Sequence, residues 1–195
     1  NIKLFPIEKI EVLNLKILDS IELENYFLEN LKANNLLFLN KKKIINLTKK
    51  YQLIETIEIK KVYPNKIKLK IFEKIPIGIL HKGKDNFYII SDGKVIKFFK
   101  NKKLEKLPSI YGKKENFVDI YKALIMEKFP LKEIKAFYFF EIGRWDIALK
   151  NKKIIKLPAQ NFQKSIQNFV KYMDKIDFDN YTIFDYRINN QLILN

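Results

Sequence analysis

Lysine and apolar residues alternate strictly from Lys66 to Ile71, and few structures accommodate such a pattern. Successive side chains of a β-strand point to opposite faces, so the alternation predicts a strand with one lysine-rich face and one apolar face. Residues 56–61 alternate in the same way, and Pro64-Asn65 between the two segments predicts a turn. The two segments therefore predict an antiparallel hairpin with one face to be covered.

Two predicted helices and one predicted strand precede this hairpin. Asp19 stands three residues before Glu22, which is the spacing of a capping box. The apolar residues that follow have nearly helical spacing: Ile21, Leu23, Phe27, Leu28 and Leu31. Asn40 is a suitable cap for a second helix over residues 41–50, and residues 7–13 resemble a strand. The order strand, helix, helix, strand, strand within about 75 residues predicts an α+β unit.

The rest of the chain also alternates between strands and helices. Asp92-Gly93 predicts a hairpin turn, and "FYFF" at residues 137–140 is interpreted as a buried strand and not as a stacking platform. The other expected elements are an extended loop at 107–112, helices at 115–128 and 160–173, three strands within 134–157, and a last hairpin around Asn189-Asn190. We therefore expect a mixed, mainly antiparallel sheet with flanking helices.

The charge of the chain allows two explanations. Its formal net charge is +16 at pH 7, from 38 Lys and Arg residues against 22 Asp and Glu. All of these cations except Arg144 and Arg187 are lysine, and Asn, Ile, Phe and Tyr are also plentiful. An AT-rich coding sequence would produce this bias, and so would selection for an acidic partner or surface. Because readout of nucleic-acid bases depends largely on arginine, we expect no nucleic-acid partner.

Catalytic chemistry is difficult to assemble from this composition. The chain has no cysteine and a single histidine, His81, which we place in a turn. No serine lies in a Gly-x-Ser-x-Gly motif, and glycine-rich phosphate loops are missing from the sequence. The acids Asp174, Asp177 and Asp179 lack the glycine and the final glutamate of a calcium-binding loop. We therefore expect no enzyme activity, no cofactor, no metal site and no small-molecule substrate.

Several weak motifs in a fixed order resemble a known family. Residues 7–31 and 54–80 resemble the opening and the closing hairpin of a POTRA domain. The later stretches "SDGKVI", "LPSIYG", "RWDIALKNKKIIKLP" and "FDYRINNQLI" resemble the extracytoplasmic part of the bacterial cell-division family FtsQ/DivIB. The resemblance implies a POTRA domain over residues 1–75 and an FtsQ-type β-domain over residues 76–195.

The resemblance also implies a function. Members of the family act as non-catalytic divisome scaffolds that capture FtsB, together with FtsL, by β-strand addition at the C-terminal sheet edge. It implies a partner-binding segment made of Asp185, Tyr186, Arg187, Ile188, Asn189, Asn190, Gln191, Leu192, Ile193 and Leu194. Arg144 and Trp145 are further candidates. Ile188 stands where some members have an aromatic residue. The implied location is the periplasm, with one inner-membrane helix upstream of this chain.

Alternatives stay open at several points. A POTRA-type receptor or chaperone for outer-membrane or secreted chains is the second function, and a basic nucleic-acid-binding module is the third. Arg187 either faces an acidic group of the partner or pairs internally with Asp185, and Arg144 either faces the partner or stacks on Trp145. The lysines of residues 66–70 form a solvated face or attract anionic lipid headgroups.

Overall fold

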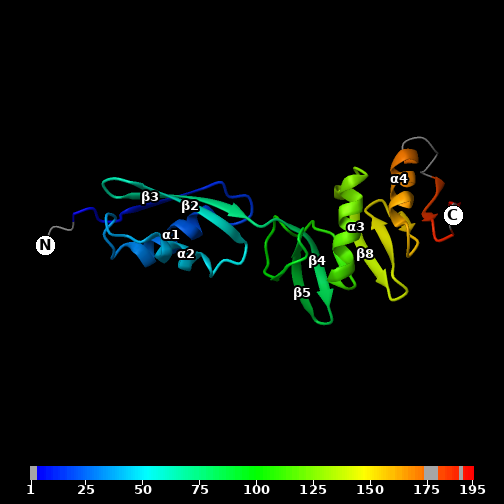
Figure 1. The fold of residues 1–195 in the computed structure, drawn as a ribbon, viewed down its shortest axis with the longest axis horizontal. Coiled ribbons are helices and arrows are strands. Elements are labelled where there is room, and N and C mark those ends of the chain that lie inside the picture. Colours follow the sequence, from blue (N-terminus) through cyan, green and yellow to red (C-terminus); the bar gives the residue numbers. More distant parts are fainter. Residues whose placement is uncertain (1–3, 174–179, 189–190) are drawn as a thin grey trace. The chain divides into compact units, whose positions relative to one another are not determined.

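The computed structural model describes residues 4–173, 180–188 and 191–195 of the 195-residue chain. The chain divides into two compact units (Figure 1). The first unit consists of Asn1–Ile75 with Asn101–Lys103, and the second consists of Pro76–Lys100 with Leu104–Asn195. Each unit has its own hydrophobic core. No helix in the described parts of the chain is long and apolar enough to cross a bilayer.

The first unit is a three-stranded sheet covered by two helices, as the POTRA pattern predicts. Its elements are β1 (Lys9–Leu13), α1 (Ser20–Leu31), α2 (Lys41–Thr48), β2 (Ile54–Val62) and β3 (Lys66–Glu73). The sheet order is β1-β3-β2, with β1 parallel and β2 antiparallel to β3. The predicted apolar face of β3 is confirmed, because Ile67, Leu69 and Ile71 are fully buried in the core.

Local capping interactions define the ends of the first unit's helices. The Asp19 side chain accepts a hydrogen bond from the backbone N–H of Glu22, and Asn40 accepts one from Lys42. Both predicted caps are thereby confirmed. Glu73, at the end of β3, accepts hydrogen bonds from the consecutive backbone N–H groups of residues 16–18. This carboxylate therefore fixes the segment that leads into α1.

The second unit is a mixed sheet of nine strands within the described residues. Its strands are β4 (Pro76–Lys82), β5 (Asp85–Ile90), β6 (Val95–Lys97), β7 (Ser109–Tyr111), β8 (Ile134–Phe140), β9 (Arg144–Leu149), β10 (Ile154–Lys156), β11 (Ile183–Asp185) and β12 (Ile193–Leu194). The order is β12-β11-β10-β9-β8-β7-β4-β5-β6. The pairs β4–β7, β7–β8 and β10–β11 are parallel, and the others are antiparallel.

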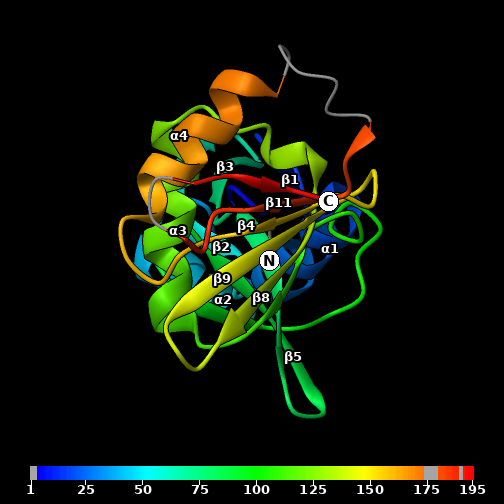
Figure 2. The same cartoon turned by 90° about the vertical axis from the view of Figure 1, so that its right-hand side faces the viewer.

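One face of this sheet carries the core. A row of apolar side chains crosses neighbouring strands in register: Leu80, Ile110, Phe137, Ile147, Ile155 and Phe184. The helices α3 (Lys114–Met126) and α4 (Phe162–Tyr172) cover this face (Figure 2). Phe117 of α3 packs edge-on against Phe137, and Phe169 of α4 packs edge-on against Phe184. A short 3-10 helix, η1 (Leu131–Glu133), precedes β8.

Two local predictions in the second unit are wrong, and a third is correct only in part. Part of the segment predicted as a loop at 107–112 is β7, a central strand that pairs on both sides. His81 lies on β4 and not in a turn. The stretch 137–140 is a strand but only half of it is buried, because Tyr138 and Phe140 lie on the face opposite the helices. Local composition did not reveal that these segments are central strands of a sheet whose face opposite α3 and α4 is partly exposed.

Candidate partner-binding site

The C-terminal edge of the nine-stranded sheet is β12. In the described part of the chain, β11 pairs with β10 on one side and with β12 on the other. Asp185 therefore lies inside the sheet, whereas Ile193 and Leu194 form its last strand. The candidate segment is thus divided between an interior strand and an edge strand, and Asn189 and Asn190 lie outside the described residues.

The hydrogen-bond register shows which main-chain groups of β12 face outward. Ile183 and Asn195 exchange two backbone hydrogen bonds, with N···O distances of 2.9 and 3.1 Å. In an antiparallel pair, hydrogen-bonded and non-hydrogen-bonded positions alternate. The next pair, Phe184 and Leu194, is therefore non-hydrogen-bonded. It follows that the N–H and C=O of Leu194 point away from β11, toward the open edge.

Arg187 is held by a neighbouring carboxylate. Its Nε donates to both oxygens of Asp185, at 2.8 and 2.9 Å. These hydrogen bonds lower the pKa of the buried Asp185 carboxyl below its ordinary value, although desolvation opposes them. Of the two alternatives for Arg187, the single chain therefore adopts the internal pair with Asp185. The Arg187 side chain nevertheless remains 45% exposed, so part of its guanidinium can still meet a partner.

Arg144 does not stack on Trp145. Successive residues of β9 point to opposite faces, so Trp145 is buried in the core against Phe117 while Arg144 lies on the face opposite the helices. The Arg144 guanidinium lies over the ring of Phe140, 4.2 Å from its centroid. Its terminal nitrogen is 3.8 Å from a carboxylate oxygen of Asp146. Desolvation raises the pKa of this buried carboxyl, although the cation of Arg144 opposes the shift.

A row of alternating charges connects these residues. Lys156 on β10 pairs in register with Asp146 on one side and with Asp185 on the other. Together with the arginines that pair with each aspartate, the row contains three cations and two carboxylates. Sequence reasoning identified Arg144, Asp185 and Arg187 but missed Asp146 and Lys156. Their proximity depends on the register between strands, which no local pattern encodes.

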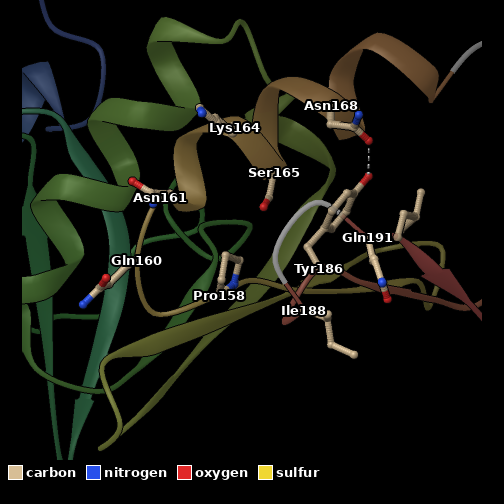
Figure 3. Close-up of a pocket in the computed structure, with 10 residues that line it drawn as sticks. Pro158, Gln160, Asn161, Lys164, Ser165, Asn168, Tyr186, Ile188 and Gln191 are labelled. Carbon is tan, nitrogen blue, oxygen red and sulfur yellow. Dashed lines mark hydrogen bonds between the residues drawn. The ribbon is translucent and has the colours of Figure 1, made fainter.

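A groove of about 560 Å³ opens beside the C-terminal segment (Figure 3). One wall is formed by α4 and the residues before it, and the other by the segment that includes Ile188 and Gln191. Tyr186 lies between the two walls, and its hydroxyl donates to the Asn168 side-chain oxygen at 3.1 Å. Burial raises the pKa of the Tyr186 hydroxyl. Ile188 is 52% exposed at the rim, so it does not fill this groove.

The α4 wall was not foreseen, although the sequence contains a signal for it. Its polar residues recur at helical spacing: Asn161, Lys164, Ser165 and Asn168. This stripe complements the apolar stripe of the same helix, which faces the core. A polar stripe is typical of any solvated helix face, so the groove became evident only from the packing of α4 beside the C-terminal segment.

The other candidate residues either pair with side chains of the same chain or lie outside the residues that the structure describes. No group of three or more potential metal-ligating side chains gathers among the described residues. Asp174, Asp177 and Asp179 lie in the part that is not described. The three lysines of β3's exposed face pair with carboxylates: Lys66 and Lys68 with Glu11, and Lys70 with Glu58. These pairs weaken the local field that would attract anionic lipids.

Comparison with known proteins gives a consistent result for both units. Residues 78–187 match the family described as cell division protein FtsQ/DivIB, C-terminal, and residues 5–74 match the FtsQ-type POTRA domain. The chain is similar to the cell division protein FtsQ of Rickettsia bellii, with 29% identity over 171 residues. Those of Rickettsia conorii and Rickettsia prowazekii are 26% and 28% identical over 171 and 169 residues. Each match covers 82% of this chain and 61% of the relative.

Proposed function

The chain belongs to the FtsQ/DivIB family of cell-division proteins, and from that premise we propose that it is a non-catalytic divisome scaffold whose β12 edge captures a partner strand. The partner is the C-terminal region of the FtsB homologue, which travels with FtsL. We further propose that this region lies in the periplasm and is attached to an inner-membrane helix. The POTRA unit and the β-unit are the two folded parts of this scaffold.

The outward main-chain groups of Leu194 are the observation that carries the proposal. An unpaired edge N–H and C=O can pair with an extended peptide, which gains affinity from main-chain hydrogen bonds. The edge strand is only two residues long, so main-chain pairing alone offers few bonds. Side-chain contacts beside the edge must therefore add affinity and selectivity.

The charged row beside the edge suits an acidic side chain of the partner. Among the described residues of this row, three cations, Arg144, Lys156 and Arg187, stand beside two carboxylates, Asp146 and Asp185. One carboxylate from a partner would balance the row. Arg187 is the member best suited to receive it, because its side chain, which ends in a planar guanidinium, is 45% exposed. The partner carboxylate joins the pair that Arg187 already makes with Asp185.

The groove beside α4 provides the second contact. Since Ile188 stands at its rim and leaves the volume free, a large side chain of the partner can enter there. The buried side chain that anchors the interface is then supplied by the partner and not by this chain. Such a buried central anchor is typical of the residues that dominate interface energy.

A binding measurement on two variants of one residue tests the proposal. Leu194→Pro removes the outward N–H, whereas Leu194→Ala shortens the same side chain and keeps that N–H. Affinity for the purified C-terminal half of the FtsB homologue from the same organism is measured by calorimetry. We expect Leu194→Pro to bind at least about tenfold more weakly than Leu194→Ala.

The control is the folding of both variants, followed by circular dichroism and thermal melting. Equal affinities of the two folded variants would show that the β12 main chain takes no part in binding. A third variant, Arg187→Lys, keeps the charge but loses the bidentate fork. We expect it to weaken binding, and unchanged affinity would remove the proposed role of Arg187.

A further inference from the structure

The loop between α1 and α2 in the first unit presents two large apolar side chains to solvent. Phe38 is 81% exposed, the highest value among the large hydrophobic residues that the structure describes, and Leu37 is 49% exposed. The residues on either side of this pair are anchored, because Leu36 and Leu39 are buried in the first core. The fold itself therefore holds Leu37 and Phe38 outward.

Hydrogen bonds on both sides fix the backbone of this loop. The Leu37 N–H donates to the Asn35 side-chain oxygen at 2.8 Å, and the Lys61 ammonium of β2 donates to the Leu37 carbonyl oxygen at 3.0 Å. An apolar side chain gains free energy when it leaves water. A fixed loop that keeps such side chains in water is a candidate contact surface, once a second feature identifies what covers it.

The second feature is the charge around the loop. Residues 30–54 contain six lysines and no acidic residue, whereas the remainder of residues 1–75 contains nine lysines and nine acidic residues. The net charge of residues 1–75 therefore arises within this one segment. A uniform coding bias does not produce such an uneven distribution, so the segment indicates an anionic partner. Its lysines are Lys32, Lys41, Lys42, Lys43, Lys49 and Lys50.

No carboxylate balances these six cations. All six are exposed, and none of them forms an ion pair with a residue that the structure describes. Lys43 donates to the Asn34 side-chain oxygen, and Lys50 lies over the ring of Tyr26, so the contacts of both are with neutral groups. The lysines of β3, in contrast, pair with carboxylates. The positive field of residues 30–54 is thus available to a partner.

We propose that the loop with Leu37 and Phe38 docks on the surface of a lipid bilayer that carries anionic headgroups. The two apolar side chains enter the boundary between headgroups and acyl chains, and the lysines of residues 30–54 contact the phosphate groups around them. Exposed apolar side chains surrounded by unpaired cations match these two layers of a bilayer. This docking rests on the membrane location proposed above and not on strand capture at β12.

The arrangement of the patch favours a bilayer over an acidic protein. The lysines follow α1, begin α2 and follow α2, and the eight residues of α2 alone span about 12 Å. Cations spread in this way suit an extended layer of headgroups, whereas recognition of one carboxylate needs convergent donors. The protruding Phe38 would need a matching pocket on a protein, but it can enter a fluid bilayer without one.

Binding to vesicles of two compositions tests the proposal. The full chain is sedimented at physiological salt with vesicles of phosphatidylcholine alone, or of phosphatidylcholine with an equal amount of phosphatidylglycerol. We expect binding to the anionic vesicles to be at least about tenfold stronger, because each lysine near such a surface contributes about fivefold. Phe38→Ser should weaken this binding at least about fivefold. Ile21→Ser is the control, because Ile21 is 68% exposed but begins α1, at the end away from the loop.

Two double substitutions separate local charge from net charge. Lys41→Gln with Lys42→Gln removes two unpaired cations next to the loop and should weaken binding to the anionic vesicles at least about tenfold. Lys68→Gln with Lys70→Gln removes the same total charge from β3, where carboxylates already balance it. We expect this second pair to change binding by less than about threefold. Equal losses for the two double variants would mean that net charge alone acts, and would overturn the proposal.

Tryptophan fluorescence distinguishes insertion of the loop from adsorption by charge. The natural Trp145 is buried, so its emission should change little when vesicles are added. In the variant Phe38→Trp, the emission should shift to shorter wavelength with the anionic vesicles, because the indole enters a less polar medium. Binding without this shift would overturn the proposal. Equal binding to both vesicle compositions, or no binding at all, would also overturn it, and the latter result would favour an acidic protein as the occupant.

Controls keep this docking separate from folding and from partner capture. Thermal melting of every variant follows the fold, which substitutions of exposed side chains should leave intact. Leu194→Pro should leave vesicle binding unchanged, and Phe38→Ser should leave the affinity for the C-terminal half of the FtsB homologue unchanged. A failure of membrane docking is thereby distinguishable from a failure of strand capture at β12.

Discussion

Two aspartates that flank the same lysine have opposite pKa shifts. Asp185 accepts several hydrogen bonds from Arg187, and its pKa is lowered. Asp146 faces its arginine only at 3.8 Å, and desolvation raises its pKa. At the residue scale, the quality of the hydrogen bonds, and not the mere presence of a cation, decides whether a buried carboxylate stabilises the fold.

Replacement of Asp185 tests this difference. A carboxyl with a lowered pKa in the folded state stabilises the fold above its unfolded pKa, about 3.9, and that contribution is lost as pH falls through the folded pKa. We expect Asp185→Asn to lower the unfolding free energy by about 1–2 kcal/mol at pH 7. The difference should shrink below about pH 4, as urea unfolding at several pH values would show. Asp119→Asn, a substitution of an exposed aspartate, should have little effect at any pH.

At the element scale, close packing restricts which residue can connect β7 to α3. Gly112 lies between these elements with φ +156°, and a Cβ there would overlap Phe139 and press against Trp145. Both aromatic residues belong to the hairpin of β8 and β9. The connection from strand to helix therefore needs a residue without a side chain, and the "LPSIYG" motif ends on glycine for this steric reason.

Substitution of two glycines separates steric overlap from backbone strain. Gly112→Ala should lower the unfolding free energy by about 1–3 kcal/mol, because the packed neighbours must move. Gly83→Ala is the matched control. Gly83 also has a positive φ, +61°, but no atom lies within 4 Å of the added Cβ. Chemical denaturation of both variants should show the larger loss for Gly112→Ala, and equal losses would mean that backbone conformation alone is responsible.

At the scale of the whole molecule, two separate hydrophobic cores support the two compact units. The first core includes Leu69 and the second includes Ile147, and both side chains are completely buried. Neither core cluster contains a residue of the other. Because cooperative unfolding reflects shared contacts, the two units are expected to unfold as two cooperative parts.

Calorimetric scans of core variants test this expectation. Leu69→Ala should destabilise the first unit by about 2–5 kcal/mol and lower the temperature of one transition only. Ile147→Ala should lower the temperature of the other transition by the same mechanism. A single transition that moves with both substitutions would mean that the units unfold together.

Much of the fold could be predicted from local patterns. The lysine and apolar alternation of β3, the caps Asp19 and Asn40, and the Asp92-Gly93 turn depend on neighbours within a few residues. The family resemblance also depends on local patterns, because it rests on short motifs in a fixed order. In contrast, β7 is short and lacks alternation beyond Ser109–Tyr111. It is a strand because β4 and β8, from distant parts of the chain, pair with it on both sides.

Side-chain periodicity is a property of consecutive residues, and for that reason the amino-acid sequence alone determined most of the elements, the α+β class and the FtsQ/DivIB membership. Strand register is a property of residues far apart, and only the tertiary structure decided it. Register places Asp185 inside the sheet and directs the Leu194 main chain outward. It also assembles Asp146, Lys156 and Asp185 into one row, because strand pairing, unlike periodicity, is settled by the packing of the entire core.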